Sequence, residues 1–149
     1  MNDNEYAMRF KKYHTEVRIL YADTDAMGIV WHGNYVRFFE FGRTEALREI
    51  GFPYVEFESR GFMMPLYNVT VDYKRPARFD DVLDIASWPR RLGAAKITIG
   101  YEVTNKATGE LLVTGETTHA IVNSDMKPVN IRKAYPEFAE RMLALSEER

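Results

Sequence analysis

The sequence predicts an α+β fold, in which a curled antiparallel sheet of about five strands wraps around one long central helix. The first observation is that residues 35–50 place apolar side chains at offsets of three and four, over more than one narrow stripe. Such a helix is enclosed rather than laid on a surface. The second is that later segments alternate apolar and polar residues and are joined by hairpin-length turns, too short for the crossover helices of parallel strands. A sheet curled around the helix would hide the apolar sides of both.

The ends of the long helix are marked with different clarity. Gly51 follows Ile50 directly and Pro53 comes soon after, which is the usual left-handed stop and a residue that cannot continue a helix. At the start, Asn34 is a candidate cap, but Arg37 stands where a capping box has glutamate. The first turn therefore begins at Asn34 or a residue or two earlier.

The strands are predicted from alternation and from residues that favour extended structure. A helix from Pro136 to about residue 147 is predicted to lie on the surface with one apolar face. The expected strands are 15–20, 67–73, 82–88, 97–103 and 111–122, and the two hairpin connections are 91–94 and 105–109.

Length and composition restrict the class of protein. The 149 residues suit a single domain, 1–149, with its core at about 14–123 and the C-terminal helix at about 136–147. Twenty Lys plus Arg against 22 Asp plus Glu argue against a protein that coats nucleic acid or an acidic membrane. No apolar run approaches the roughly 20 residues that span a bilayer, so we expect a cytoplasmic protein rather than an integral membrane protein.

Several chemistries are excluded by absent residues or patterns. The chain has no cysteine, so disulfides, thiolate metal sites and cysteine nucleophiles are ruled out. The three histidines are too scattered for a metal motif, and the chain has no G-x-S-x-G elbow, phosphate loop or dinucleotide fingerprint. We therefore expect neither a metal nor a cofactor.

A short polar turn precedes the long helix and carries Asp23, Asp25 and His32. Helix N-termini offer unpaired N–H donors and the positive end of the helix dipole, which bind anions and stabilise an oxyanion. A carboxylate beside them can act on a carbonyl held there. The pattern indicates acyl transfer without a serine or cysteine nucleophile.

The same residues resemble a known active-site signature. The run Asp23-Thr24-Asp25, Gly28, Val30, Trp31-His32, Asn34-Tyr35 and Arg43 is similar to that of the hotdog-fold acyl-CoA thioesterases of the 4-hydroxybenzoyl-CoA thioesterase type, including the branch linked to the Tol-Pal system. The resemblance extends from about residue 17 to about residue 122. It implies a hotdog fold and hydrolysis of an acyl-CoA or acyl carrier protein thioester. It also implies a homodimer or homotetramer with active sites at the dimer interface.

By this resemblance, Asp25 is the catalytic carboxylate, either as the nucleophile or as the base that activates water. The simpler interpretation is that Asp25 only closes an Asx-turn ahead of the helix. His32 is the second catalytic candidate, through its backbone N–H on the thioester oxygen or through its imidazole on the leaving group. We expect Asp23 to be structural. Glu40 and Glu45 are weaker candidates for the essential carboxylate, since another hotdog branch places it on the helix.

Coenzyme A carries phosphates, so a basic patch is expected near the cleft. Arg90, Arg91 and Lys96 flank the hairpin where relatives place basic residues, although this chain has Gly93 where they often have arginine. The alternative is that these charges are merely solvated. Arg75 and Arg78 are further candidates with the same alternative. His119, within the last strand, is expected to be structural.

Two other functions stand beside hydrolysis. A hotdog enoyl-thioester hydratase or dehydratase also uses an aspartate and a histidine, but this chain lacks the Gly-Asp-x-Asn-Pro-x-His pattern of that group. A non-catalytic hotdog protein that binds acyl carriers would be expected to have lost the Asp25 motif, which is complete here. Hydrolysis is therefore the favoured function.

Overall fold

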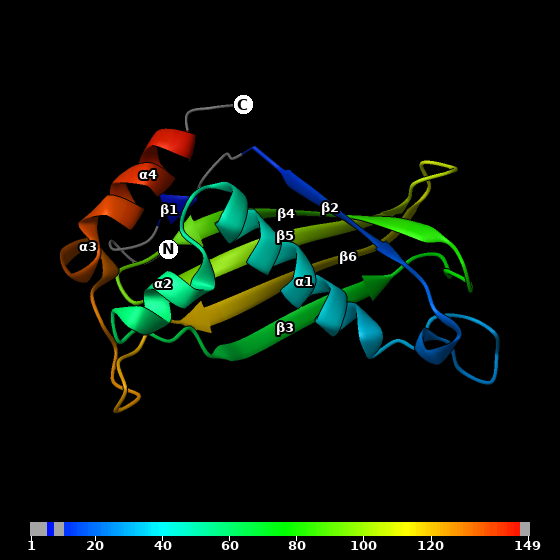
Figure 1. Ribbon diagram of the computed structural model, residues 1–149, viewed down its shortest axis with the longest axis horizontal. Helices are drawn as coiled ribbons and strands as arrows, with labels where there is room; N and C mark the ends of the chain where they lie inside the picture. The colour runs from blue at the N-terminus through cyan, green and yellow to red at the C-terminus, as the bar shows by residue number, and fades with distance from the viewer. Residues whose placement is uncertain (1–5, 8–10, 147–149) are drawn as a thin grey trace.

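The computed structural model describes residues 6–7 and 11–146, and its strands form one antiparallel sheet (Figure 1). β1 and β2 pair with opposite ends of β4, so the sheet is five strands wide, in the order β2, β4, β5, β6, β3 with β1 beside the far end of β4. β3 is therefore an edge strand, paired with β6. The strands are β1 (Tyr6–Ala7), β2 (Tyr13–Arg18), β3 (Leu66–Tyr73), β4 (Val82–Leu92), β5 (Lys96–Asn105) and β6 (Leu111–Ala120).

The longest described helix, α1, crosses one face of this sheet, and the other α-helices gather at the end of the sheet where β1 lies (Figure 1). A short 3₁₀ turn, η1, leads from β2 toward α1 at the opposite end. The helical elements are η1 (Tyr21–Asp23), α1 (Asn34–Glu49), α2 (Tyr54–Ser59), α3 (Ile131–Ala134) and α4 (Pro136–Ser146). No helix in the described part of the chain is long and apolar enough to cross a bilayer.

Close packing fixes α1 on the sheet. The ring of Phe39 stacks on that of Tyr101 in β5, with the ring centres 4.2 Å apart. A Cβ atom at Gly115 in β6 would lie 2.4 Å from the Phe39 ring, so only glycine admits the ring at this position. Gly42 has the same function against Ile85 of β4, where an added Cβ would be 2.7 Å from a methyl carbon.

The other side of α1 is open. Phe41 is 43% exposed, and Arg37 and Glu40 are exposed as well. The expectation of a helix enclosed on all sides is therefore not confirmed for this chain on its own, because the sheet covers one side of the helix and leaves an apolar side chain in solvent.

The predicted C-terminal helix is present as α4. It does more than lie on the surface, since Phe138, Met142 and Leu145 are buried in the main hydrophobic cluster. Phe138 packs edge-to-face against Phe57 of α2, with the ring centres 4.9 Å apart. α2 and α4 therefore close the end of the core.

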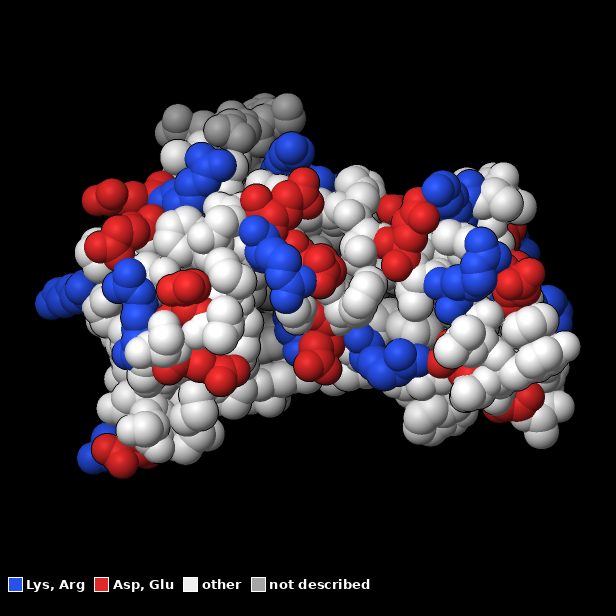
Figure 2. Space-filling view, viewed as in Figure 1, with Lys and Arg blue, Asp and Glu red and all other residues white. Residues whose placement is uncertain are grey.

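The predicted α+β class and all five predicted strands are confirmed. β4 runs to Leu92, beyond the predicted residue 88, because a bulge between Pro89 and Arg91 lets the ladder pass the proline. β1 was not predicted, since two residues are too few to show alternation. Acidic and basic side chains are interspersed over the face shown in Figure 2, as expected from the near-balanced composition.

Candidate active site

The turn between η1 and α1 is closed by its own backbone. Asp25 N–H donates to Ile29 O and Gly28 N–H donates to Asp25 O, both at 2.9 Å, and Thr24 and Val30 form an isolated β-bridge. Gly28 has φ +77°, in the left-handed region that favours glycine. The loop therefore holds Asp25 at a defined position before the helix.

The Asp25 carboxylate has one occupied and one free oxygen. Its Oδ1 accepts a hydrogen bond of 2.9 Å from Met27 N–H, which is an Asx-turn. Its Oδ2 has no hydrogen-bond partner among the described residues. The half-buried side chain also lines a groove of about 350 Å³ with His32, Tyr35 and Tyr73. The Asx-turn of the simpler interpretation is thus present, and the same side chain also borders a groove; a catalytic role of Asp25 stays a prediction.

His32 stands directly before α1 and lines the same groove. Asn34 N–H donates to Trp31 O at 2.9 Å, whereas the N–H groups of His32 and Gly33 have no acceptor in the described part of the chain. The carbonyl of His32 accepts a hydrogen bond of 2.8 Å from the Tyr73 hydroxyl. Two unpaired N–H donors therefore lie at the positive end of the helix dipole, and His32, which carries one of them, borders the groove.

Asp23 fastens the turn to the helix. It is 7% exposed, with Oδ1 2.5 Å from Arg37 Nη2 and Oδ2 accepting from Leu20 N–H at 2.8 Å. Its carbonyl accepts from Trp31 N–H at 2.9 Å and from the Asn34 side-chain amide at 2.8 Å. The sequence made Asn34 a candidate helix cap. In the structure it is instead the first residue of α1, and its side chain ties the helix to Asp23.

Two tyrosines, Tyr35 and Tyr73, also line the groove. Burial raises the pKa of Tyr35 to about 12; the charges of Tyr73 and Asp81 also raise it, and a hydrogen bond with the Ala77 backbone opposes them. Burial raises the pKa of Tyr73 too. The two rings pack edge-to-face with centres 5.6 Å apart. Both hydroxyls are protonated at neutral pH, so Tyr73 is a donor to His32.

The three predicted CoA-binding residues do not lie with Asp25. Arg90 and Arg91 are in the part of β4 nearest β1, at the opposite end of the sheet from Asp25, and Lys96 begins β5 beside them. Glu116 carboxylate oxygens lie 2.5 Å from Arg90 Nη1 and 3.9 Å from Arg91 Nη1. A role of these residues in CoA binding stays a prediction.

Lys74 and Arg75 are the basic residues that do line the Asp25 groove. Arg75, a secondary candidate from the sequence, is exposed, and its Nε lies 4.0 Å from a Glu110 carboxylate oxygen. Lys74 was missed by sequence reasoning. The available signal was its position directly after a strand and two residues before Pro76, where a chain leaves a sheet edge.

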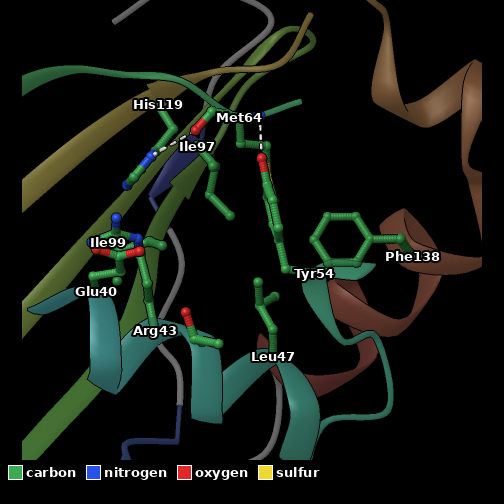
Figure 3. A pocket seen from close by; sticks show the side chains of 10 residues that line it. Glu40, Arg43, Leu47, Tyr54, Met64, Ile97, Ile99, His119 and Phe138 are labelled. Atoms are coloured by element: carbon green, nitrogen blue, oxygen red, sulfur yellow. Dashed lines mark hydrogen bonds between the residues drawn. The ribbon is translucent and has the colours of Figure 1, made fainter. Parts of the chain in front are cut away.

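A second cavity, of about 240 Å³, lies between the middle of α1, the sheet and α4 (Figure 3). Its apolar wall includes Leu47, Ile97 and Phe138, and its polar lining is Glu40, Arg43, Thr44, Tyr54 and His119. His119 is 3% exposed; burial, together with the nearby Arg43 charge, lowers its pKa to about 4, and a hydrogen bond to the Met64 carbonyl opposes this. No single segment predicts this cavity, because its lining comes from segments far apart in the chain.

The described residues contain no group of three or more His, Asp or Glu side chains that could hold a metal ion.

Comparison with known proteins gives concordant results. A family model described as the thioesterase-like superfamily matches residues 19–142. The acyl-CoA thioester hydrolase YbgC of Escherichia coli is 34% identical over 119 residues, covering 79% of this chain and 88% of YbgC. YneP of Bacillus subtilis is 34% identical over 124 residues, covering 83% of this chain and 89% of YneP. The crystal structure of a DHNA-CoA thioesterase from Staphylococcus aureus is similar, with a TM-score of 0.86 and 28% identity, covering 91% of each chain.

Proposed function

The chain belongs to the thioesterase-like superfamily, and from this premise we propose how its groove hydrolyses a thioester. The protein is an acyl-CoA thioesterase with the hotdog fold that the resemblance implied.

The thioester carbonyl is placed at the start of α1, where its oxygen accepts a hydrogen bond from the backbone N–H of His32. As negative charge develops on this oxygen, the helix dipole and the unpaired donor stabilise it more than they stabilise the ground state. One such donor is typically worth about 2.7–4 kcal/mol of barrier. The support for this step is that the His32 N–H has no acceptor among the described residues.

Asp25 drives the attack through Oδ2. It either adds to the carbonyl carbon, expels the CoA thiolate and forms an anhydride that water cleaves, or it removes a proton from the water that attacks. The Asx-turn through Oδ1 restrains the carboxylate and leaves Oδ2 available. The observation that carries the proposal is that Asp25, with its free oxygen, and His32, with its unpaired N–H, border one groove.

The His32 imidazole is assigned to the leaving group. Its side chain is exposed and borders the groove, so it can donate a proton or a hydrogen bond to the departing CoA sulfur. The expected contribution is smaller than that of Asp25, because a thiolate leaves readily without full protonation.

The working form is proposed to be a homodimer joined along β3. Among the described strands, β3 pairs only with β6, so its other edge is open. An eight-residue edge strand presents unpaired N–H and C=O groups, and Tyr67, Val69 and Tyr73 along it are exposed. Tyr73 also borders the groove, so a second copy at this edge completes the site. Pairing of dimers into a tetramer, a cytoplasmic location and use of acyl carrier protein thioesters stay expectations from the resemblance.

The test is thiol release from a panel of acyl-CoA and acyl carrier protein thioesters by the native chain, Asp25→Asn and Asp125→Asn. Asp25→Asn is expected to lose about a hundredfold to ten-thousandfold in kcat/KM, in line with removal of a catalytic acid-base group. Asp125→Asn, in an exposed loop, is the matched control and is expected to keep native activity. Native turnover by Asp25→Asn would refute the catalytic role of Asp25. Hydration of an enoyl thioester without thiol release would favour the hydratase or dehydratase alternative.

A further inference from the structure

Arg43 extends from α1 into the second cavity and lies beneath His119 (Figure 3). Its Nη1 is buried and has no hydrogen-bond partner among the described residues. A buried charged donor without an acceptor is costly, and native structures leave few such groups. The Arg43 guanidinium therefore has a donor that the described chain leaves without an acceptor, and Arg43 itself lines the cavity.

No hydrogen bond joins Nη1 to the polar residues behind Arg43, whose own hydrogen bonds run in one direction. The Met64 carbonyl only accepts, so His119 Nδ1, at 3.2 Å, carries the proton. His119 is neutral at pH 7, so its Nε2 accepts from the Thr117 hydroxyl at 2.9 Å. Thr117 Oγ1 in turn accepts from the Tyr101 hydroxyl at 2.7 Å, and the nearby Arg43 charge lowers the pKa of Tyr101 against the larger, opposite effect of burial.

Tyr54 of α2 lines the same cavity. The oxygen of Tyr54 accepts a hydrogen bond of 3.1 Å from Met64 N–H, shown as a dashed line in Figure 3. The O–H of Tyr54 has no acceptor in the described part of the chain. Glu40 lines the cavity too, but it is exposed and forms no ion pair with Arg43. The cavity is thus lined by two hydrogen-bond donor residues, Arg43 and Tyr54, of which Arg43 is charged.

The edge pairing proposed above brings this cavity to the catalytic groove. At one end of β3, Tyr73 bonds to His32; at the other, Leu66 pairs with His119 across the sheet. When two copies of β3 pair antiparallel about a two-fold axis, the Tyr73 end of one copy meets the Leu66 end of the other. The groove of one subunit therefore lies beside the cavity of its partner. Within one chain, by contrast, Arg43 is nine residues along α1 from Asn34, about 13 Å of helix.

We propose that Arg43 of the partner subunit selects acyl groups whose far end carries a carboxylate, which binds in the 240 Å³ cavity with Tyr54 as second donor. A carboxylate has two oxygens for the two donors, and its charge matches the guanidinium. The apolar walls accept the methylene chain that leads to it. This inference rests on the proposed function, since the groove must hold the thioester while the cavity holds the tail. Half-thioesters of short dicarboxylic acids are the substrate class.

The first experiment compares matched pairs of acyl-CoA thioesters of equal carbon number, from butanoyl to octanoyl, one ending in methyl and the other in carboxylate. The native enzyme is expected to prefer the carboxylate member at the best length. Arg43→Met is expected to lower this preference, measured as the ratio of kcat/KM values, by at least about tenfold, as expected for loss of a charge-assisted hydrogen bond. Arg43→Lys keeps the charge and should retain part of the preference. It also serves as the test variant if Arg43→Met does not fold.

The matched control is Arg48→Met, on the same helix, where Arg48 is exposed and pairs with Glu45. It should leave the preference at the native value. Glu40→Gln removes the opposing charge at the cavity and should increase the preference. A preference that is absent in the native enzyme, or that survives in Arg43→Met, would overturn the inference while leaving thioester hydrolysis intact.

The second experiment tests the contribution of the partner subunit. Asp25→Asn and Arg43→Met chains with different affinity tags are co-expressed, and the mixed dimer is purified through both tags. If the site combines the two subunits, one site of the mixed dimer has both native residues and turnover of the carboxylate-tailed thioester returns to about half the native value. If both residues act in one chain, every site carries a defect and no recovery occurs, which refutes the arrangement.

A binding measurement separates this inference from the proposed function. NMR titration of the native chain with the free dicarboxylate should shift the resonances of His119 and Tyr54 saturably, and Arg43→Met should abolish the shifts. If no thioester is cleaved but the dicarboxylate binds, the proposed function fails and the cavity assignment stands. If thioesters are cleaved and the dicarboxylate does not bind, the cavity assignment fails alone.

Discussion

The hydroxyl of Tyr73 donates a hydrogen bond of 2.8 Å to the main-chain carbonyl of His32, and this bond joins the edge strand β3 to the start of α1. The peptide group that follows His32 is thereby held from one side, while the His32 N–H is left free. The position of the proposed oxyanion donor thus depends on a residue from another element.

Tyr73→Phe is expected to lower kcat by about threefold to tenfold, which is the value of a typical neutral hydrogen bond. The ring and its packing on Tyr35 are kept, so the free energy of unfolding should change little. Steady-state thiol release is the measurement. Tyr67→Phe, an exposed tyrosine of the same strand, is the control and should behave as native. Equal kcat values for Tyr73→Phe and the native enzyme would show that His32 is positioned by other contacts.

Asp23→Asn is expected to lower the free energy of unfolding by about 2 kcal/mol. Both carboxylate oxygens of Asp23 accept from donors, Arg37 Nη2 and Leu20 N–H. An asparagine in either orientation turns its own N–H groups toward one of these donors. Urea denaturation gives the stability. Asp80→Asn, whose ion pair with Arg18 is exposed, should change stability by much less.

His119 is expected to make stability depend on pH between its ordinary pKa of 6.5 and its lowered pKa of about 4. In this window the unfolded chain binds a proton that the folded chain does not, so stability falls as pH drops from 6.5 toward 4 and the loss levels off below that. The full effect is about 3 kcal/mol. His119→Gln keeps one donor and one acceptor but does not titrate. The free energy of unfolding against pH should therefore be flatter for this variant, and parallel curves would contradict the assignment.

A charged residue on β3 is expected to separate the proposed dimer. Val69→Asp places a carboxylate at the middle of the edge strand, where it would meet its own copy across the two-fold axis. Light scattering should change from a dimeric to a monomeric mass, and thiol release should fall with it. Val55→Asp, at an exposed position of α2, is the control. A Val69→Asp protein that stays dimeric would place the interface elsewhere.

Local chemistry accounts for the features of the fold that the sequence predicts. Gly51 adopts φ +93° directly after the C-cap residue of α1, as its place before Pro53 indicated. Asp25 and His32 are close in the chain and on the two sides of one turn, so a short motif was enough to bring them into one groove.

Features that depend on contacts between distant segments could not be predicted from the sequence. No local pattern shows that β3 lies at the edge beyond β6, because strand order is set by long-range packing. The apolar character of Phe41 predicts burial but does not distinguish the chain's own sheet from a second chain, and here the residue is 43% exposed. Arg43 of α1 lies close to Tyr101 and His119 on two strands, and no pattern within a single segment predicts this proximity.

The ordered hydrogen bonds from Tyr101 through Thr117 to His119 have an evolutionary consequence. Each hydroxyl donates its one hydrogen to the next member. An isolated change such as Thr117→Val therefore leaves the Tyr101 hydroxyl without its acceptor and His119 Nε2 without its donor in the core. A lineage can therefore lose or replace this set only by exchanging several members together. We expect the three positions to be inherited as a unit, even though they are scattered over two strands.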